Sequence, residues 1–246
     1  MKTRPAEIVY IDIETAPFLG YAWEKWETNI IDIVNNWYML SFSYKKLGEK
    51  KATTKCLIDY PNYALDKEDD GALVADLWKV LDSADIVIAH NGDRFDILKS
   101  NVRFIAHKME PPSPYKTIDT LKVARRYFKF DSNKLDELCR YLGIGRKLPH
   151  TGFHLWKQCM SGDPKQWEVM RRYNEHDIEL LEKLYYRFLP WIKNHPNVNQ
   201  GQTACPKCSA TRGQQKRGFS YTALKKKQRF QCTSCTGWYE GSSVKV

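Results

Sequence analysis

The stretch EIVYIDIE, residues 7–14, decides the expected fold. Its run of β-branched and aromatic residues is nearly continuous, which is typical of a strand buried in the centre of a sheet. Asp12 and Glu14 lie two positions apart within it, so on a strand both side chains point to the same face. Adjacent like charges repel each other, so either this strand ends in solvent or a divalent cation neutralises the pair.

The segments that follow alternate between strand and helix patterns. A loop containing Pro149 and Gly152 is expected before the last helix, and Asp93 is the expected N-cap of the helix it begins. The expected fold class is α/β, with a mixed sheet flanked by helices. Strands are expected at 38–47, at 50–60, at 85–90 and within 111–128, and helices at 71–84, at 93–109, at the end of 111–128, at 132–144 and at 165–188.

Two further acids lie where a lone carboxylate is costly. Asp96 follows a buried strand in IAHNGDRFD, residues 88–96, a place where α/β sheets gather ligands; its alternative role is to complement a helix N-terminus. Asp177 interrupts the apolar stripe of the helix RRYNEHDIELLEKLYYRF, residues 171–188. Together with the pair on the first strand they offer oxygen ligands for two Mg²⁺ or Mn²⁺ ions about 3.5–4 Å apart, an arrangement that hydrolyses phosphodiesters.

Three short motifs carry a resemblance to a known family. DIE (12–14), HNGDRFD (90–96) and YNEHD (173–177) resemble the three exonuclease motifs of the DEDD superfamily, whose members have a DnaQ-like, ribonuclease H-like fold. The second motif is similar to that of family B DNA polymerases. The surrounding GYAWEKWE and LPWIKNHPN are similar to phage or bacterial stand-alone exonucleases with a zinc-binding tail. The resemblance implies a 3′→5′ exonuclease.

The resemblance also implies a role for each motif residue. One branch of the superfamily positions the attacking water with a histidine five residues before the last Asp, where this chain has Arg172. The other branch uses a tyrosine four residues before it, which is Tyr173, so the chain resembles the tyrosine (DEDDy) branch. His176 is rotated by about 100° from the last Asp on a helix and is poorly placed for this role. The implied metal ligands are Asp12, Glu14, Asp96 and Asp177.

Three nearby residues have more than one interpretation. Asn91 could bond the terminal nucleotide or could cap the turn that contains it. Phe95 could stack on a base or could belong to the core. Asp119 lies at the end of a possible strand and is interpreted as structural. Asn91 and Phe95 are retained as candidate substrate-binding residues.

The seven cysteines separate into two groups. CPKC (205–208) and CTSC (232–235) form two CxxC pairs, the spacing of a four-cysteine zinc ribbon that holds one structural Zn²⁺; a redox dithiol is the alternative. The other three, Cys56, Cys139 and Cys159, are expected to be buried thiols. The expected division is an exonuclease domain over 1–195, a linker over 196–204 and a zinc ribbon over 205–246, with Cys205, Cys208, Cys232 and Cys235 as zinc ligands.

Positive charge is concentrated in the tail. The chain has a net charge of +10, and from residue 201 onward nine basic residues face one acid, so the tail carries +8 and the body +2. Cations interleaved with aromatic residues in this tail fit single-stranded nucleic acid. The alternatives are a solvated basic tail and aromatic residues that form the ribbon's own core. The candidate phosphate contacts are Lys225, Lys226, Lys227 and Arg229.

The expected function is a two-metal 3′→5′ exonuclease that releases nucleoside monophosphates from nucleic acid, with DNA bearing a single-stranded 3′ end as the expected partner. The alternatives are an RNA exonuclease, a non-catalytic nucleic-acid-binding replication adaptor and a zinc-ribbon interaction module. No apolar run approaches the ~20 residues of a membrane span, and the start MKTRPAEIVY lacks the core of a signal peptide. A cytoplasmic protein is therefore expected, in the host cytoplasm if the gene belongs to a phage.

Overall fold

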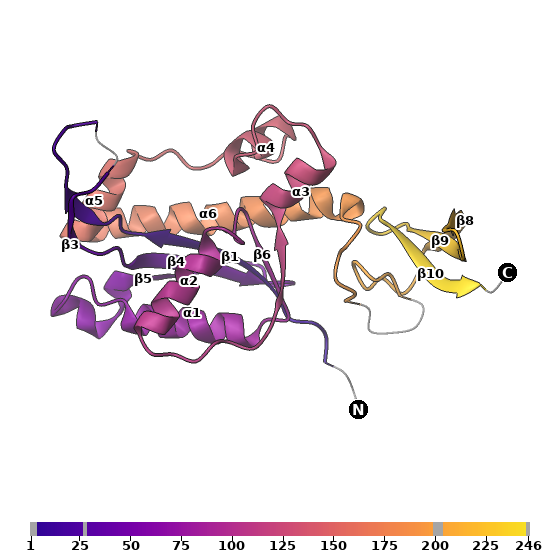
Figure 1. Ribbon diagram of the computed structural model, residues 1–246, viewed down its shortest axis with the longest axis horizontal. Coiled ribbons are helices and arrows are strands. Elements are labelled where there is room, and N and C mark those ends of the chain that lie inside the picture. The colour runs from indigo at the N-terminus through magenta and orange to yellow at the C-terminus, as the bar shows by residue number, and fades with distance from the viewer. Residues whose placement is uncertain (1–3, 27–28, 199–203, 245–246) are drawn as a thin grey trace.

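The computed structural model describes residues 4–26, 29–198 and 204–244 (Figure 1). Its central sheet has the strand order β5-β4-β1-β6-β7. The first strand runs antiparallel to β4 and parallel to β6, so the sheet is mixed, and the predicted α/β fold class is confirmed. The strands of this sheet are β1 (Ile8–Thr15), β4 (Met39–Lys46), β5 (Thr53–Cys56), β6 (Ile86–Ala89) and β7 (Lys116–Asp119).

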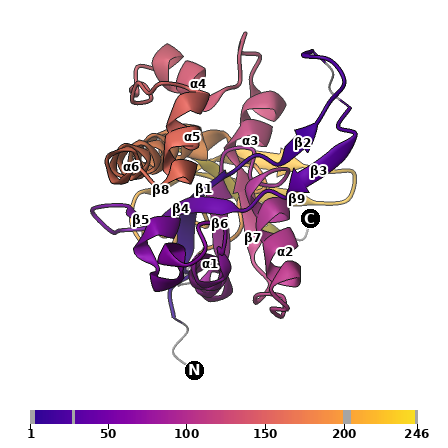
Figure 2. The same ribbon diagram turned by 90° about the vertical axis from the view of Figure 1, so that its left-hand side faces the viewer.

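Helices cover both faces of the sheet (Figures 1 and 2). The long helix α6 lies on one face, and α1 and α2 lie on the other. Alternation along β1 directs Val9 and Ile11 into the core that includes α1, whereas Tyr10 packs against Tyr185 of α6 with ring centroids 5.8 Å apart. The helices are α1 (Gly71–Ser83), α2 (Asp96–Ala106), α3 (Thr120–Tyr127), α4 (Leu135–Tyr141), α5 (Phe153–Ser161) and α6 (Pro164–Phe188), with short 3₁₀ helices at Leu57–Asp59, Pro61–Ala64 and Leu189–Trp191.

The predicted start of the second helix is wrong. We expected Asp93 to cap it, but α2 begins at Asp96 with Phe95 at the N-cap position. The preceding residues form a turn in which Asn91 has a φ of +67° and its carbonyl accepts from the backbone amides of Arg94 and Phe95. The carboxylate of Asp93 instead pairs with Lys122 at 2.6 Å. The turn thus takes up residues that the pattern assigned to the helix.

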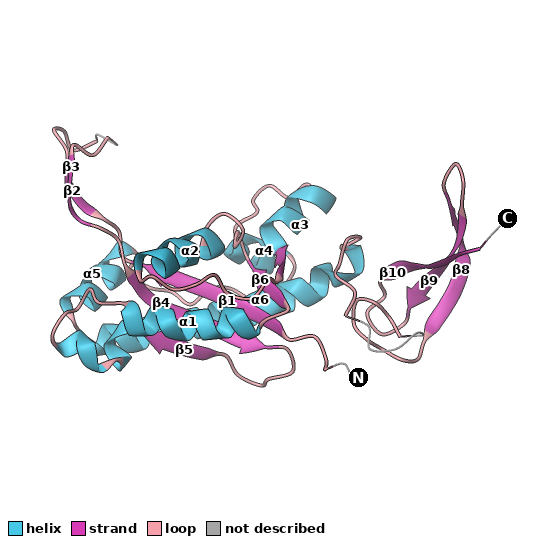
Figure 3. Ribbon diagram, turned by 60° about the horizontal axis from the view of Figure 1, so that its bottom comes forward, coloured by secondary structure: helices cyan, strands magenta, loops and turns pink. Residues whose placement is uncertain are grey.

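Two elements lie where no regular structure was expected. Helix α5 occupies the predicted loop after Gly152, which has a φ of +64°, and it ends at Gly162, which has a φ of +96°. The helix is only nine residues long, so its apolar periodicity is weak. A two-stranded hairpin, β2 (Leu19–Tyr21) and β3 (Asp32–Asn35), leaves the body directly after β1 and pairs with no other sheet of the described chain (Figure 3).

The C-terminal sheet docks at the far end of α6, away from the hairpin (Figure 1). Its antiparallel strands, in the order β10-β9-β8, are β8 (Gln214–Tyr221), β9 (Lys226–Cys232) and β10 (Trp238–Val244). Lys207 is buried, with 5% of its surface exposed. Its ammonium donates to the carbonyls of Leu189 (3.3 Å) and Pro190 (3.0 Å). Of the predicted linker 196–204, residues 199–203 lie outside the described residues.

Composition separates α6 from a membrane helix. Asp163 caps its start by accepting from the amide of Lys165, and Pro164 occupies the first turn. The helix has 25 residues, many of them charged on the outer face. Within the described residues, no helix is both long and apolar enough to cross a bilayer.

The turn between β6 and α2 is tightly packed at Gly92. A Cβ atom there would lie 2.4 Å from the Cβ of Ala89, which is closer than carbon atoms can approach. Gly71, at the start of α1, is a matched contrast because a Cβ there would approach only side-chain atoms of Asp69 and His107, at 3.2 and 3.4 Å.

We expect Gly92→Ala to destabilise the protein by about 1–3 kcal/mol, because the turn must shift to admit a methyl group. Chemical denaturation followed by circular dichroism measures the change. Gly71→Ala serves as the control and should be neutral or slightly stabilising, since alanine favours a helix more than glycine does. Equal stability of Gly92→Ala and the parent protein would contradict the close packing.

Candidate active site and cysteine cluster

The two acids of β1 lie in the part of this strand that extends beyond its pairing with the parallel strand β6. Pairing with β6 covers only Ile8, Val9 and Tyr10. Beyond this pairing, the backbone amide of Ile13 donates to Oδ1 of Asp96 at 3.0 Å instead of to a neighbouring strand. This hydrogen bond ties the first residue of α2 to the end of β1, because a buried backbone amide needs an acceptor.

Helix α6 brings the fourth acid to the same place. Asp12 and Glu14 alternate with core residues of β1 and share the face that α6 covers. Asp177 on α6 is 1% exposed and Asp96 is 2% exposed. Their mutual electrostatic effects place all four sequence-predicted acids in one region, where Asp12 and Glu14 are half-buried.

Burial raises the pKa of each acid, and repulsion from the other acids adds to this rise for Asp12 and Glu14. For Asp12 burial is the largest cause, followed by the charges of Asp96, Glu14 and Asp177. Burial raises the pKa of Glu14 to about 8, against the opposing effect of Lys147. Burial raises the pKa of Asp96 to about 7, although the amide of Ile13 opposes it. The region therefore needs positive charge to keep its carboxylates ionised.

Two oxygens in this region lack hydrogen-bond partners. They are Oδ2 of Asp12 and Oδ1 of Asp177, both buried. Unpaired buried carboxylate oxygens are costly, and they fit ligands of a hard divalent cation. Among the described residues the carboxylate oxygens are not grouped as tightly as the four cysteine sulfurs, which lie within 4.8 Å of one another.

Lys147 is a site residue that the sequence analysis missed. Its ammonium donates to Oδ2 of Asp177 at 2.6 Å and to the hydroxyl of Tyr173 at 2.8 Å. Burial opposes its charge, but Asp177, Tyr173 and Asp12 outweigh this effect and raise the pKa of Lys147 above its usual value. The lysine lies in a loop 26 and 30 residues before these partners, and no local pattern marks it.

The loop that carries Lys147 is held from both sides. The backbone amide of Lys147 donates to Oδ1 of Asp136 at 2.7 Å. Nε2 of His176 lies 2.7 Å from the carbonyl of Arg146, to which it donates. His176 thus turns away from the carboxylates, and its contact helps to place the neighbouring lysine.

Tyr173 belongs to a small aromatic group beside the acids. Its ring centroid lies 4.8 Å from that of His150 and 6.2 Å from that of Trp156. Burial raises the pKa of the Tyr173 hydroxyl, with a further contribution from Asp177. The indole of Trp156 is hydrogen-bonded to Glu14, which opposes the rise in the pKa of Glu14. Tyr173 therefore stays protonated at neutral pH and can act only through hydrogen bonds.

The three other residues considered near the acids are Asn91, Phe95 and Asp119, and their contacts and exposure distinguish their roles. The backbone amide of Asn91 donates to Asp119 at 2.9 Å, and its carbonyl holds the turn, so its contacts are those of a capping residue. Phe95 is 37% exposed and is not a core residue. Asp119 caps α3 by accepting from the amides of Leu121 and Lys122, which agrees with its structural interpretation.

The four tail cysteines form a cluster whose dimensions suit zinc. Their sulfurs lie within 4.8 Å of one another, and the Cys205–Cys235 and Cys208–Cys232 pairs are both separated by 3.8 Å. A tetrahedral ion with Zn–S bonds of 2.3 Å places its sulfurs about 3.8 Å apart, so the cluster is compatible with a zinc ribbon. The other three cysteines, Cys56, Cys139 and Cys159, are buried elsewhere, as predicted.

Basic and aromatic side chains meet on the ribbon. Lys226 lies 4.1 Å from the ring centroid of Phe219, and Arg229 lies 5.7 Å from that of Trp238. Lys227 pairs with Glu240 at 3.0 Å, and Lys225 is exposed. The rings of Phe230 and Tyr239 stack at 5.3 Å as part of the ribbon's own packing. The stacking of Phe230 on Tyr239 supports the ribbon-core interpretation for these two rings, and nucleic-acid binding by the other rings stays a prediction.

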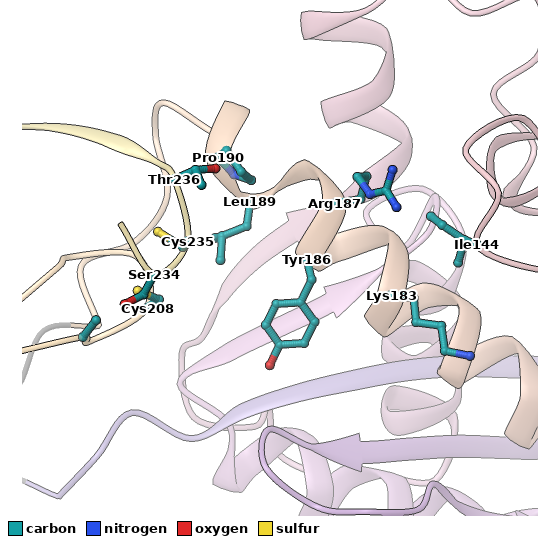
Figure 4. A pocket seen from close by; sticks show the side chains of 11 residues that line it. Ile144, Lys183, Tyr186, Arg187, Leu189, Pro190, Cys208, Ser234, Cys235 and Thr236 are labelled. Carbon is teal, nitrogen blue, oxygen red and sulfur yellow. The ribbon is translucent and has the colours of Figure 1, made fainter. Parts of the chain in front are cut away.

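A cavity of about 740 Å³ lies between α6 and the ribbon (Figure 4). Lys183, Tyr186 and Arg187 line it from α6, and Cys208 and Cys235 line it from the ribbon. None of the described residues that line it is acidic, so it lacks the oxygen ligands that Mg²⁺ or Mn²⁺ prefers and is separate from the carboxylate region.

The mixed sheet, with acids at the end of its central strand and on the helix that crosses it, defines a ribonuclease H-like fold. The RNase_H_2 family model of the RNase_H superfamily matches residues 9–189, and the chain belongs to this superfamily. Its membership supports a nuclease that acts on nucleic acid and uses divalent metal ions.

One solved structure with this fold is the family B DNA polymerase from the hyperthermophilic archaeon Pyrobaculum calidifontis. The TM-score is 0.56 with 14% identity over 76% of this chain, which spans a quarter (25%) of the polymerase chain. At this identity the likeness shows the fold alone. The search of curated proteins found no match.

The raised pKa values of the acids predict how stability depends on pH when divalent ions are absent. Because the folded-state pKa of Glu14 is about 8 and that of Asp96 is about 7, the native state holds extra protons below these values. Their contribution to stability is present at pH 4 and is lost as the pH rises to 8. In EDTA we expect the Tm to fall by roughly 5–10 °C across this range in calorimetry.

Glu14→Gln is the control for this pH dependence. Its Tm should fall less between pH 4 and 8, because one titrating acid is gone. Burial lowers the pKa of His90, which acts in the opposite direction, but this histidine is present in both proteins and cancels in the comparison. Identical pH profiles of variant and parent would show that Glu14 does not carry a raised pKa.

The cysteine cluster predicts one zinc ion per chain, measured by plasma emission spectroscopy. We expect Cys232→Ser to lose this zinc, because a structural site needs all four ligands. Cys159→Ala, at a buried cysteine outside the cluster, should retain it. Full zinc content in Cys232→Ser, or a disulfide found within the cluster by mass spectrometry, would contradict the assignment.

Proposed function

We propose that this protein is a metal-dependent 3′→5′ exonuclease that releases nucleoside monophosphates from the 3′ ends of nucleic acid, with DNA as the polymer. The observation that carries the proposal is the meeting of four acids in one region, in which Asp96 and Asp177 are buried and two carboxylate oxygens are unpaired. The motif order and spacing support the direction of cleavage. Superfamily membership supports the nuclease class.

Asp12, Glu14, Asp96 and Asp177 are the proposed ligands of two Mg²⁺ or Mn²⁺ ions. Their all-oxygen donor set fits these hard cations, and the unpaired oxygens of Asp12 and Asp177 are available for them. When bound, such ions lower the pKa of a water and stabilise the departing 3′-oxygen. Cations would also relieve the repulsion that raises the pKa of Asp12 and Glu14.

Tyr173 and Lys147 would act directly on the reacting groups. The Tyr173 hydroxyl would orient the attacking water by a hydrogen bond, since its raised pKa makes it a poor base. The Lys147 ammonium, which stays charged, would release Asp177 to the metal and stabilise negative charge on the phosphate. Both roles need donors already held in place, and the contacts of Asp136 and His176 hold the lysine loop.

The ribbon would grip the strand at a distance from the scissile bond. Asp177 and the end of α6 at Phe188 are separated by eleven residues, or about 16 Å of helix. The cations of the ribbon, Lys225, Lys226, Lys227 and Arg229, would therefore contact nucleotides far from the 3′ terminus, or a duplex region. Zinc would support this binding surface rather than the chemistry, because its four ligands leave no open position.

Two alternatives make different predictions. An RNA exonuclease would use the same acids and differ in how the pocket treats a 2′-hydroxyl. A non-catalytic adaptor on a nuclease fold needs none of the acids, whereas this chain has all four and Tyr173.

The central test uses purified protein with 5′-labelled single-stranded DNA, duplex DNA and RNA in Mg²⁺ or Mn²⁺. We expect a ladder that shortens from the 3′ end, and we expect Asp12→Ala to lower its rate by more than about 100-fold, because a ligand of the ions is lost. The ratio of DNA to RNA cleavage decides the polymer. Absence of metal-dependent cleavage on every substrate would leave the adaptor as the better reading.

Tyr173→Phe should slow cleavage by about 100-fold with little change in DNA binding, because only the hydroxyl is removed. His176→Ala is the matched control on the same helix, and its effect should be much smaller. A reversal of these two effects would show that the water-positioning residue is misassigned.

A further inference from the structure

The β2–β3 hairpin exposes an unusual set of apolar side chains. Trp23 is 85% exposed and Trp26 is 86% exposed, and both lie near the tip. Contiguous exposed apolar surface on this scale usually marks a site of interaction. The same hairpin segment exposes Phe18, Leu19, Tyr21, Ile31, Ile33 and Val34.

A groove of about 500 Å³ lies at the base of this hairpin and is lined in part by Thr15, the last residue of β1. Phe18 and Trp37 line it from the hairpin side, and Phe153 and Trp156 line it from α5. Trp156 also touches the acids, because its indole is hydrogen-bonded to Glu14. The aromatic surface thus continues from the proposed catalytic groups to the hairpin.

Lysine side chains accompany these aromatic rings at three separate places. Lys99 lies 3.7 Å from the ring centroid of Trp37. Lys157 lies 5.5 Å from the centroid of Phe153, and Lys25 lies 5.1 Å from that of Trp26. A flat ring beside an ammonium offers one surface for a base and one charge for a phosphate, which is the combination that binds single-stranded nucleic acid.

We propose that these residues form an aromatic–lysine track that binds the unpaired nucleotides next to the 3′ terminus. The track comprises Trp156, Phe153, Trp37, Phe18, Trp23 and Trp26 with Lys25, Lys99 and Lys157. Its orientation along the strand rests on the proposed function, since the terminus must reach the carboxylates. The track makes an unpaired end the preferred substrate, because the bases of a duplex stack on one another and cannot stack on the protein's aromatic rings.

Charge distinguishes the track from the ribbon. Residues 19–35 contain Glu24, Glu27 and Asp32 against the single base Lys25, so the hairpin segment is net acidic and not a basic surface. Stacking therefore contributes more to binding there than phosphate attraction does. The ribbon's cations make binding strongly dependent on salt, whereas stacking depends on it little. A protein partner would not need the three lysine–aromatic pairs or the continuity with the acids, so nucleic acid is the favoured occupant.

The test measures binding without cleavage. Full-length Asp12→Asn protein is titrated with a fluorescein-labelled eight-nucleotide thymidine strand, followed by anisotropy and by quenching of tryptophan fluorescence. Adding Trp23→Ala and Trp26→Ala should weaken binding at least about tenfold, because the bases lose the two indole rings on which they stack. Replacing both tryptophans by phenylalanine should restore most of the affinity. Tyr141→Ala, at an aromatic residue that is 75% exposed elsewhere, should change nothing.

Binding of the double alanine variant within twofold of its parent would overturn the track. If that variant also lost a self-association seen for the parent by sedimentation, the hairpin would be a protein-binding surface and the proposal would be wrong. A cleavage assay of the protein with Asp12 intact distinguishes failure of the track proposal from failure of the proposed nuclease function. Cleavage without a binding change refutes only the track, whereas a binding change without cleavage refutes only the nuclease.

Discussion

Four acids gathered beside the end of one strand, two buried and two half-buried, impose the constraint that organises this protein. Desolvation favours their neutral forms and raises the pKa of each, and mutual repulsion adds to this effect for Asp12 and Glu14. The chain answers with Lys147, whose ammonium contacts Asp177 at 2.6 Å. It also ties Asp96 to the amide of Ile13. One lysine cannot balance four carboxylates, and the unpaired oxygens that remain are suited to cations bound from solution.

Helix α6 connects this region with the rest of the molecule. Tyr173 and Asp177 lie on the turns that face the acids, and the helix then continues for about three turns to the ribbon. There the buried ammonium of Lys207 binds the carbonyls of Leu189 and Pro190, where the helix leaves acceptors unpaired and its dipole favours a cation. The ribbon is therefore fixed to the same element that carries two site residues, which sets its distance from the carboxylates.

The two ends of the molecule offer different chemistry to a nucleic acid. The ribbon presents cations whose binding falls with salt, as Lys226 and Arg229 do beside their aromatic neighbours. The hairpin presents exposed rings such as Trp23 and Trp26 with few charges. A strand held by both would have stacked bases near the acids and bound phosphates further away. In the proposed function the ribonuclease H-like body supplies the acids, and the hairpin and the ribbon would select what reaches them.

The sequence by itself determined the parts that depend on neighbours along the chain. The apolar run of β1, the capped α6 and the paired CxxC motifs each report burial or ligand geometry within a few residues. Only the tertiary structure decided that Lys147 meets Asp177 thirty residues away, or that Asp93 pairs with Lys122 instead of capping α2. Whether a side chain is covered, paired or exposed depends on what the folded chain places beside it, and local periodicity carries no record of that.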